Sequence, residues 1–333
     1  MVKKLVNTTG NVKWLSPAGK LVALLLALVI VQVLISTNII NDYIFATFVT
    51  IGINIILAVS LNLITGFTGQ FSLGHAGFMS IGAYTCAIIT LRYSTVFGFL
   101  GGVIAGAVFA AFVGVLVGLP TLRLKGDYLA IATLGMAEII KILFRNVLED
   151  ITNGAAGLSG IPQYVNWLWL FIFTAGTVTL INNFIKSSPG RACISIREDE
   201  IAAEAMGINS TKYKVMAFVT GAFFAGIAGA IYASYFYFIS PDLFGFQKSI
   251  DILVIVVLGG MGSLSGSVVS AILLALISTY LQSFPELRMI IYGVLLVVIM
   301  LFRPQGIMGS KELSLSLLQK WIQGIRRKNG GAA

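Results

Sequence analysis

The sequence has 333 residues, of which 57% are hydrophobic and only 11% are charged, whereas about a quarter of the residues of an ordinary soluble domain are charged. The net charge of +9 could suggest a nucleic-acid partner, but in so apolar a chain basic residues are first tested as topology signals. Cys86 and Cys193 form neither a disulfide framework nor a metal-ligand cluster. Composition therefore excludes an ordinary soluble domain and predicts one polytopic membrane domain without a nucleic-acid partner.

Apolar runs recur along the chain at roughly the 20 residues that a helix needs to cross a bilayer. The first run follows several lysines, as in a secretory signal, but no small-residue cleavage pattern follows it and a second run begins almost at once. We interpret it as a retained span. The fold class is therefore all-α, a transmembrane bundle of about ten spans, predicted near Leu21–Ser36, Ile44–Ile64, Phe71–Leu91, Val96–Leu119, Tyr128–Leu148, Trp167–Ile185, Val215–Phe238, Ile250–Gly260, Leu264–Phe284 and Met289–Phe302.

The distribution of charge predicts the orientation of these spans. If the amino terminus is cytoplasmic, the cytoplasmic segments hold most of the 22 Lys and Arg residues, and the opposite loops collect acidic residues such as Glu149 and Asp242. Basic residues in short loops mark the cytoplasmic side, so both termini are predicted to be cytoplasmic. The expected organisation is a cytoplasmic segment 1–20, a transmembrane domain 21–303 with a cytoplasmic loop 186–214, and a basic tail 304–333 beside anionic lipid.

Two predicted spans are interrupted by glycines. Residues 65–84 mix glycines with polar side chains, and the run after Lys248 meets Gly259, Gly260 and Gly262 before it could cross the bilayer. Irregular backbone at membrane depth persists only where protein or a water-filled cavity satisfies its polar groups, so both segments are candidates for lining a path. The alternative is that these glycines let helices pack closely. Both interpretations stay open for Gly66, Gly69, Gly74, Gly77 and Gly82.

The alternating direction of the spans permits an inverted repeat. Spans two to five would enter from outside and spans seven to ten from inside, an arrangement that transporters use to place a path at the repeat interface. No sequence match between the two halves accompanies it.

Several polar residues fall within predicted spans. Glu138 and Lys141 share one helical face, and either charge alone would cost about 2.5–3.5 kcal/mol at the bilayer centre, so we expect a pair that lines a path or joins two helices. Asn54 and Asn62 have the same alternatives, with bonding between helices favoured. His75 is the one histidine, which excludes a metal site or proton relay built from several histidines. The predicted path residues are Asn62, Gly69, Gln70, Ser72, Gly74, His75, Glu138, Gly260 and Gly262.

The longest cytoplasmic loop predicts a short surface helix. Strong helix formers run from Arg197 to Met206, acidic residues lie near the start, and Gly207 stands where a left-handed cap would end the helix. Ile201, Ala202, Ala205 and Met206 form a small apolar stripe. Such a helix could dock into a groove on a soluble partner, or it could lie on the membrane surface.

The chain has no phosphate-binding loop, nucleophile elbow or zinc-binding helix, so we predict no catalytic residue, no metal site and no enzyme activity.

Five motifs, in order, carry a resemblance to a known family. Together they make the chain resemble LivM-type permease subunits of high-affinity ABC importers for branched-chain amino acids, over roughly residues 61–273. The motifs are SLNLITGFTGQFSLGHAGFMSIGAY, LRLKGDYLAIATLGMAEII, NGAAGLSGIP, RACISIREDEIAAEAMGINSTKYKVMAF and LGGMGSLSGSVVSAIL.

This resemblance implies a multi-pass protein of the cell (inner) membrane whose partners are a second homologous permease, two ABC ATPases and an extracytoplasmic solute-binding protein. ATP and Mg would be bound by the ATPases, and this chain would hold no cofactor. Transport of urea or another amide is the alternative within the family; an ion-coupled secondary transporter and a passive channel are alternatives outside it. The residues that the resemblance assigns to coupling with the ATPase are Arg197, Glu198, Asp199, Ala202, Glu204 and Gly207.

Overall fold

A computed structural model of the protein describes residues 41–281 without a gap and the single positions or short stretches 28, 31–33, 35, 37, 284, 290, 291, 293, 294, 297, 301 and 306–309. The segment 1–20, most of the predicted first and tenth spans, and the tail 304–333 apart from 306–309 lie outside the described residues. The chain divides into two compact units, Met1–Asp42 with Leu313–Ala333, and Tyr43–Glu312. The second unit contains the helical bundle.

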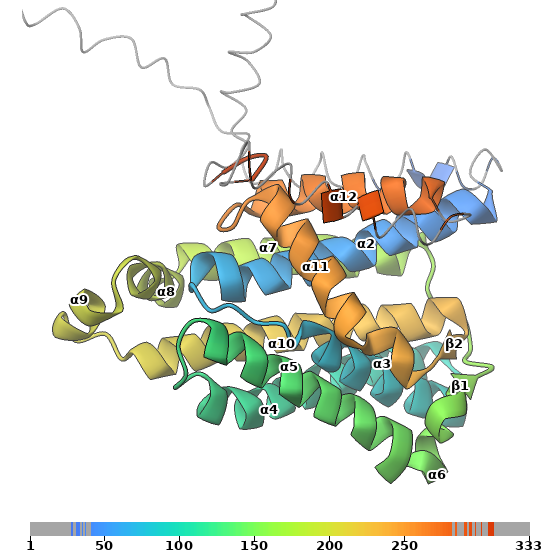
Figure 1. Ribbon diagram of the computed structural model, residues 1–333. Helices are drawn as coiled ribbons and strands as arrows, with labels where there is room; N and C mark the ends of the chain where they lie inside the picture. Colours follow the sequence, from blue (N-terminus) through green and yellow to red (C-terminus); the bar gives the residue numbers. More distant parts are fainter. Residues whose placement is uncertain are drawn as a thin grey trace, which may run out of the picture. The chain divides into compact units, whose positions relative to one another are not determined.

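The described part of the chain is mostly helical, and its helices can be followed in chain order in Figure 1. Its elements are α2 (Asp42–Asn62), the π-helical turn η1 (Leu63–Phe67), α3 (His75–Arg92), α4 (Val96–Thr121), α5 (Asp127–Ile142), the π-helical turn η2 (Leu143–Val147), α6 (Glu149–Thr152), the 3-10 turn η3 (Gly154–Ala156), β1 (Leu158–Ser159), α7 (Trp167–Lys186), α8 (Ser188–Glu198), α9 (Glu200–Ala205), α10 (Ser210–Phe236), β2 (Phe238–Ile239), the 3-10 turn η4 (Pro241–Phe244), α11 (Phe246–Gly259) and α12 (Leu264–Tyr280).

Within the described residues, four helical stretches are long and apolar enough to cross a membrane: Asp42–Phe67, Val96–Thr121, Trp167–Lys186 and Ser210–Phe236. They coincide with predicted spans. The helices α3, α5, α11 and α12 also coincide with predicted spans, and each is shorter than these four. The described residues thus form a multi-pass helical bundle, whereas ten spans and cytoplasmic termini stay predictions.

The helices α3, α4 and α10 pack through glycines. A Cβ atom added to Gly82 of α3 would collide with the carbonyl group of Gly226 in α10, and one added to Gly106 of α4 would lie 2.9 Å from the carbonyl oxygen of Gly82. A Cβ atom on Gly229 of α10 would likewise collide with the carbonyl oxygen of Met79. Small residues let helix backbones approach in this way, so the close-packing interpretation accounts for Gly82.

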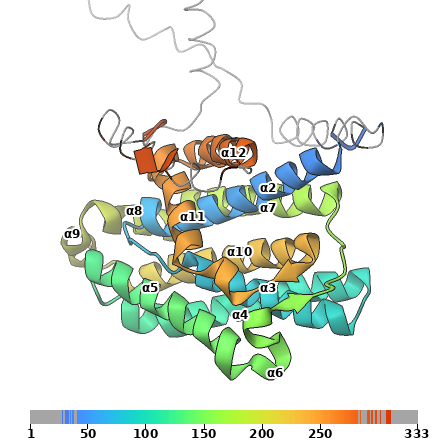
Figure 2. The same cartoon turned by 45° about the vertical axis from the view of Figure 1, so that its right-hand side comes forward.

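The loops of the unit gather at its two ends (Figures 1 and 2). The helices α8 and α9 lie at one end together with the α4–α5 connection, which carries Arg123 and Lys125. At the opposite end lie α6, with Glu149 and Asp150, and the antiparallel pair β1–β2, in which Leu158 faces Ile239. The basic α4–α5 connection therefore lies at the opposite end of the unit from the acidic helix α6.

The helix predicted from Arg197 to Met206 is present as α9 (Glu200–Ala205), but it begins three residues later than predicted. The structure has two helices, α8 and α9, which meet at Asp199. Asp199 has an extended backbone, with φ −157° and ψ 109°, and its carboxylate caps α9. Aspartate competes with helical hydrogen bonding through such local bonds, which explains why the helix breaks there.

Candidate functional site

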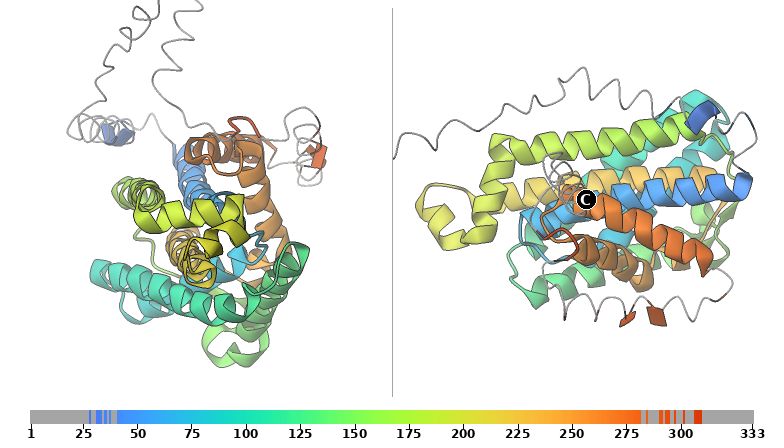
Figure 3. Two further views of the ribbon diagram at one scale, coloured as in Figure 1. Left: turned by 90° about the vertical axis from the view of Figure 1, so that its left-hand side faces the viewer. Right: turned by 90° about the horizontal axis from the view of Figure 1, so that it is seen from above.

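The pair α8–α9 protrudes beyond the long helices (Figure 3) and is built from local capping signals. Ser187 caps α8, with Pro189 in its first turn. Asp199 then caps α9, because its Oδ1 accepts a hydrogen bond from the N–H of Ala202 at 3.0 Å. Gly207 has φ +82° and so provides the predicted left-handed end. The N–H of Gly207 donates to the carbonyl oxygen of Glu204 at 2.9 Å.

Charged residues hold α9 to its neighbours. Glu200 accepts a hydrogen bond from Nζ of Lys214 in α10 at 2.7 Å and lies 3.4 Å from Nζ of Lys125 in the α4–α5 connection. Partial burial of Glu200 works to raise the pKa of its carboxyl group, but the hydrogen bond and charge of Lys214 and the charge of Lys125 outweigh it, and the pKa is lowered. Glu204 also accepts a hydrogen bond from the hydroxyl of Ser210. These contacts fix α9 against α10 and the α4–α5 connection.

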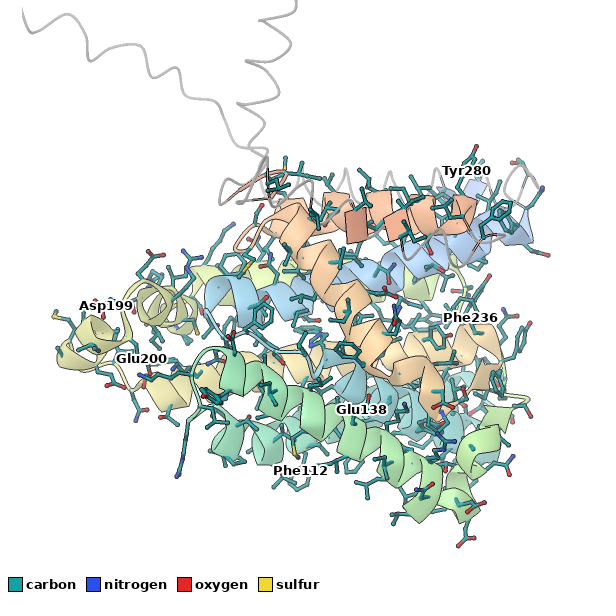
Figure 4. All side chains as sticks on the ribbon, viewed as in Figure 1. Phe112, Glu138, Asp199, Glu200, Phe236 and Tyr280 are labelled. Atoms are coloured by element: carbon teal, nitrogen blue, oxygen red, sulfur yellow. The ribbon has the colours of Figure 1, made fainter. Side chains whose placement is uncertain are left out.

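The outer face of α9 presents apolar side chains to the surroundings. Ile201 is 78% exposed and Met206 is 83% exposed, and Ala202 and Ala205 are exposed beside them. Ala203, on the inner face, is buried. The predicted apolar stripe thus exists and has no cover within the described chain. Figure 4 shows Asp199 and Glu200 at this protruding end.

The two glycine-rich interruptions are real breaks. Between α2 and α3 the chain passes through η1 and the irregular residues 68–74, where Gly69 has φ +74°. Between α11 and α12 it turns through residues 260–263, where Gly260 and Gly262 have φ +109° and +88°. Positive φ angles favour glycine, which explains the residue choice at these three positions.

Asn62 joins the two breaks. Its Nδ2 donates to the carbonyl oxygen of Ser263 at 2.9 Å and to Oγ of Ser267 at 2.7 Å. Its Oδ1 accepts from the N–H of Gly262 at 2.9 Å. Asn62 is fully buried. The structure thus shows the bonding between helices that the sequence favoured for this residue.

The α8–α9 segment also reaches the region where the two breaks meet, through Arg197. Its Nη1 donates to the carbonyl oxygen of Gly66 in η1 at 2.8 Å, and its Nε donates to Oε1 of Glu198 at 3.1 Å. Arg197 lines a cavity of about 260 Å³ together with Gln70 and Lys125. Of the six predicted coupling residues, Arg197 is turned inward and the other five are exposed: Glu198, Asp199, Ala202, Glu204 and Gly207.

Of the other predicted path residues near the first break, Gly69 is exposed, whereas Gln70, Ser72, Gly74 and His75 are buried. Gln70 has no hydrogen-bond partner for either amide atom among the described residues. His75 and Ser60 share a hydrogen bond of 2.8 Å through Nε2 and Oγ. Ser72 accepts a hydrogen bond at 3.4 Å from the N–H of Gly74, and a Cβ atom on Gly74 would lie 2.6 Å from the carbonyl oxygen of Thr133 in α5.

Glu138 lies away from these breaks, on α5 (Figure 4). It pairs with Lys141 at 3.6 Å, and Lys141 and Arg145 each lie 3.5 Å from Asp242 in η4. Oε1 of Glu138 also accepts from the N–H of Phe246, the first residue of α11, at 3.1 Å. The expected pair therefore belongs to a charged network that joins α5 and η2 to η4 and α11.

Sequence reasoning missed the partners that lie far away along the chain. Lys125 and Lys214 were recognised as topology signals, but not as ion-pair partners of Glu200. The ion pair between Asp242 and Lys141 was not predicted either. No local pattern marks such contacts. Among the described residues, no group of three or more His, Cys, Asp or Glu side chains could hold a metal ion.

A multi-pass bundle with two broken helices and a protruding helical pair defines a membrane transporter subunit. Residues 43–300 match the family model described as "Branched-chain amino acid transport system / permease component", and the chain belongs to this family.

Relatives agree with this assignment. The chain is 37% identical over 299 residues to "High-affinity branched-chain amino acid transport system permease protein LivM" of Salmonella typhimurium, covering 80% of this chain and 70% of that protein. The LivM protein of Escherichia coli strain K12 gives the same values. The LivH permease of Salmonella typhimurium is 26% identical, with 78% and 92% covered.

One solved structure is also similar, a chain of "PsaBC from Streptococcus pneumoniae in complex with Fab". It is 12% identical, covers 83% of this chain and 97% of that chain, and has a TM-score of 0.45. A score of this size does not establish a shared fold.

Proposed function

We propose that the chain is the permease subunit of an ABC importer that moves leucine, isoleucine and valine across the cell (inner) membrane, driven by ATP hydrolysis in partner subunits. The family match and the LivM and LivH relatives support the substrate class. The observation that carries the coupling role is the capped, ion-paired helix α9, which holds Ile201 and Met206 exposed beyond the long helices. An apolar face of this kind fits a groove on a soluble partner.

The proposed assembly contains a second homologous permease, two ABC ATPases and an extracytoplasmic solute-binding protein. The ATPases would bind ATP and Mg, and this chain would be non-catalytic and free of cofactors. It would cross the membrane about ten times, with spans two to five and seven to ten as an inverted repeat and with both termini cytoplasmic. Residues 21–303 would form the permease domain, with residues 186–214 as its coupling loop.

In this proposal the solute passes beside the two broken spans. A branched-chain amino acid has a carboxylate, an ammonium group and an apolar tail, so its path needs few polar groups on apolar walls. Gln70 is the best polar candidate, since its amide is buried without a partner among the described residues and such a group is costly unless something bonds it. The remaining proposed path residues beside the breaks are Asn62, Gly69, Ser72, Gly74, His75, Gly260 and Gly262. Glu138, which lies away from the breaks, is proposed to line a more distant part of the path.

The test uses the whole complex reconstituted in liposomes with the solute-binding protein. We expect uptake of labelled leucine that requires ATP, and no uptake of labelled urea. Gly207→Pro should abolish leucine uptake, because proline cannot adopt the φ of +82° found at Gly207. Gly207→Asn is the matched control, since asparagine tolerates a left-handed backbone. Leucine uptake without ATP would indicate a passive channel, and urea uptake would indicate the amide alternative. Full uptake by Gly207→Pro would refute the coupling role of α9.

A further inference from the structure

Arg197 differs from the other arginine of α8 in where its guanidinium goes. Arg191 Nη1 donates to the carbonyl oxygen of Lys186 at 2.7 Å, a neighbour five residues away in the chain. Arg197 Nη1 donates to Gly66, which is 131 residues away and belongs to the break between α2 and α3. One arginine thus stabilises its own helix, and the other connects the cytoplasmic segment to a membrane span.

The acceptor is a carbonyl group at the end of a helix. Gly66 lies in η1, the last turn of the helical stretch that begins with α2, and no backbone N–H of the described residues donates to its oxygen. Terminal carbonyl groups lack helical partners, and a cation beside them also interacts favourably with the helix dipole. The Arg197 guanidinium meets both requirements.

The same side chain also fits against the second break. A Cβ atom on Gly262, in the α11–α12 turn, would lie 2.7 Å from Nη1 of Arg197 and 3.3 Å from the oxygen of Gly66. A Cβ atom on Gly69 would lie 3.1 Å from Cγ of Arg197. The guanidinium therefore occupies the space between the two breaks, and the absence of side chains at Gly69 and Gly262 makes that space.

We propose that Arg197 is a positioning residue that transmits the movement of α8 and α9 to the joint between the two broken spans. This inference rests on the proposed function and deepens it, because it takes Arg197 away from the surface that faces the ATPase. Displacement of α8 would pull the guanidinium from Gly66 and open the space beside Gly262. Asn62, which bonds the same α11–α12 turn, would pass the change to α12 through Ser267.

The test compares three variants in the reconstituted complex. Arg197→Gln removes the charge and shortens the side chain, whereas Arg197→Lys keeps a charged donor. Arg191→Gln removes the arginine that donates to the nearby carbonyl oxygen of Lys186. For each variant we would measure leucine uptake, ATP hydrolysis and the retention of the ATPase subunits. Amide hydrogen exchange of residues 63–69 in the complex supplies a readout that does not need transport.

Arg197→Gln should retain the ATPase subunits and ATP hydrolysis but lose most uptake, so that more ATP is used for each leucine imported. Its residues 63–69 should exchange about 10-fold to 100-fold faster, the factor that corresponds to a hydrogen bond with a charged donor. Arg197→Lys should recover part of the leucine uptake and part of the exchange protection of residues 63–69. Arg191→Gln should match the wild type in both measurements.

Two results would overturn the inference: unchanged exchange of residues 63–69 in Arg197→Gln, or loss of its ATPase subunits and hydrolysis together with uptake. The latter would make Arg197 part of the ATPase contact. If the wild-type complex showed no ATP-dependent uptake, the proposed function would fail, while the exchange comparison would still decide whether Arg197 holds the joint.

Discussion

Replacement of Asn62 by leucine should destabilise the protein, because this amide joins the two broken spans. The leucine side chain has a similar size, but it cannot accept a hydrogen bond from the N–H of Gly262 or donate hydrogen bonds to Ser263 and Ser267. All three hydrogen bonds, of 2.7–2.9 Å, would be lost at a fully buried position.

The expected decrease in the free energy of unfolding follows from the number of hydrogen bonds that Asn62 makes. A hydrogen bond within a protein contributes about 0.5–1.5 kcal/mol, and bonds between helices in a membrane average about 0.6 kcal/mol. Three bonds therefore correspond to about 2–4 kcal/mol. The buried N–H of Gly262 would also be left without its acceptor, which places the effect in the upper part of this range.

Asn54→Leu is the matched control. Asn54 lies about two turns earlier in α2 and is also buried, but its side chain makes no hydrogen bond among the described residues. Its replacement should change the free energy of unfolding by less than about 0.5 kcal/mol. Unfolding would be followed by tryptophan fluorescence in mixed micelles with increasing SDS. Equal stability of the two variants would show that the Asn62 bonds do not hold the joint.

Three further predictions address other parts of the structure. Gly82→Ala should destabilise the protein by about 1–3 kcal/mol, since its Cβ atom would meet the Gly226 carbonyl group. Gly101→Ala is the control and should leave the stability unchanged, because no atom lies within 4 Å of its Cβ. Thermal unfolding of the two variants would be compared. Asp199→Ala should destabilise α9 by about 0.5–2 kcal/mol through loss of its cap, seen as faster amide exchange of Ala202, whereas Asp199→Ser should restore protection. The pKa of Glu200 is lowered from its ordinary value of 4.5, so its ion pairs with Lys125 and Lys214 contribute full stability above that pH and lose it as the pH falls through the lowered pKa. The protection factors of the α9 amides, which compare each exchange rate with that of an unfolded peptide at the same pH, should therefore fall below pH 4.5. A similar fall in Glu200→Gln would contradict this.

The spans could be predicted because the bilayer demands long apolar runs. The prediction for residues 167–185 differs from α7 by one residue at its end, and the boundaries of α4 are nearly as close. The largest differences occur where polar residues continue a helix into water. Helix α10 begins at Ser210, before the predicted Val215, because Asn209 caps it by accepting from the N–H of Lys212 at 2.9 Å.

The site was predictable only where the signal is local. Gly207 was recognised as a helix end from its neighbours in the sequence. The Ser187 cap followed by Pro189 is a similar local signal for the start of α8, but it was overlooked in the sequence. The inward turn of Arg197 depends on a contact with Gly66 across 131 residues. The break at Asp199 comes from its local cap on Ala202, a signal that was missed. Whether Glu138 lines a path or joins helices could not be decided without the position of Asp242.

The glycine contacts among α3, α4 and α10 restrict how the molecule can change shape. The backbones of these three helices touch without intervening side chains, so any approach of one helix toward another would bring backbone atoms into collision, and the three form one closely packed block.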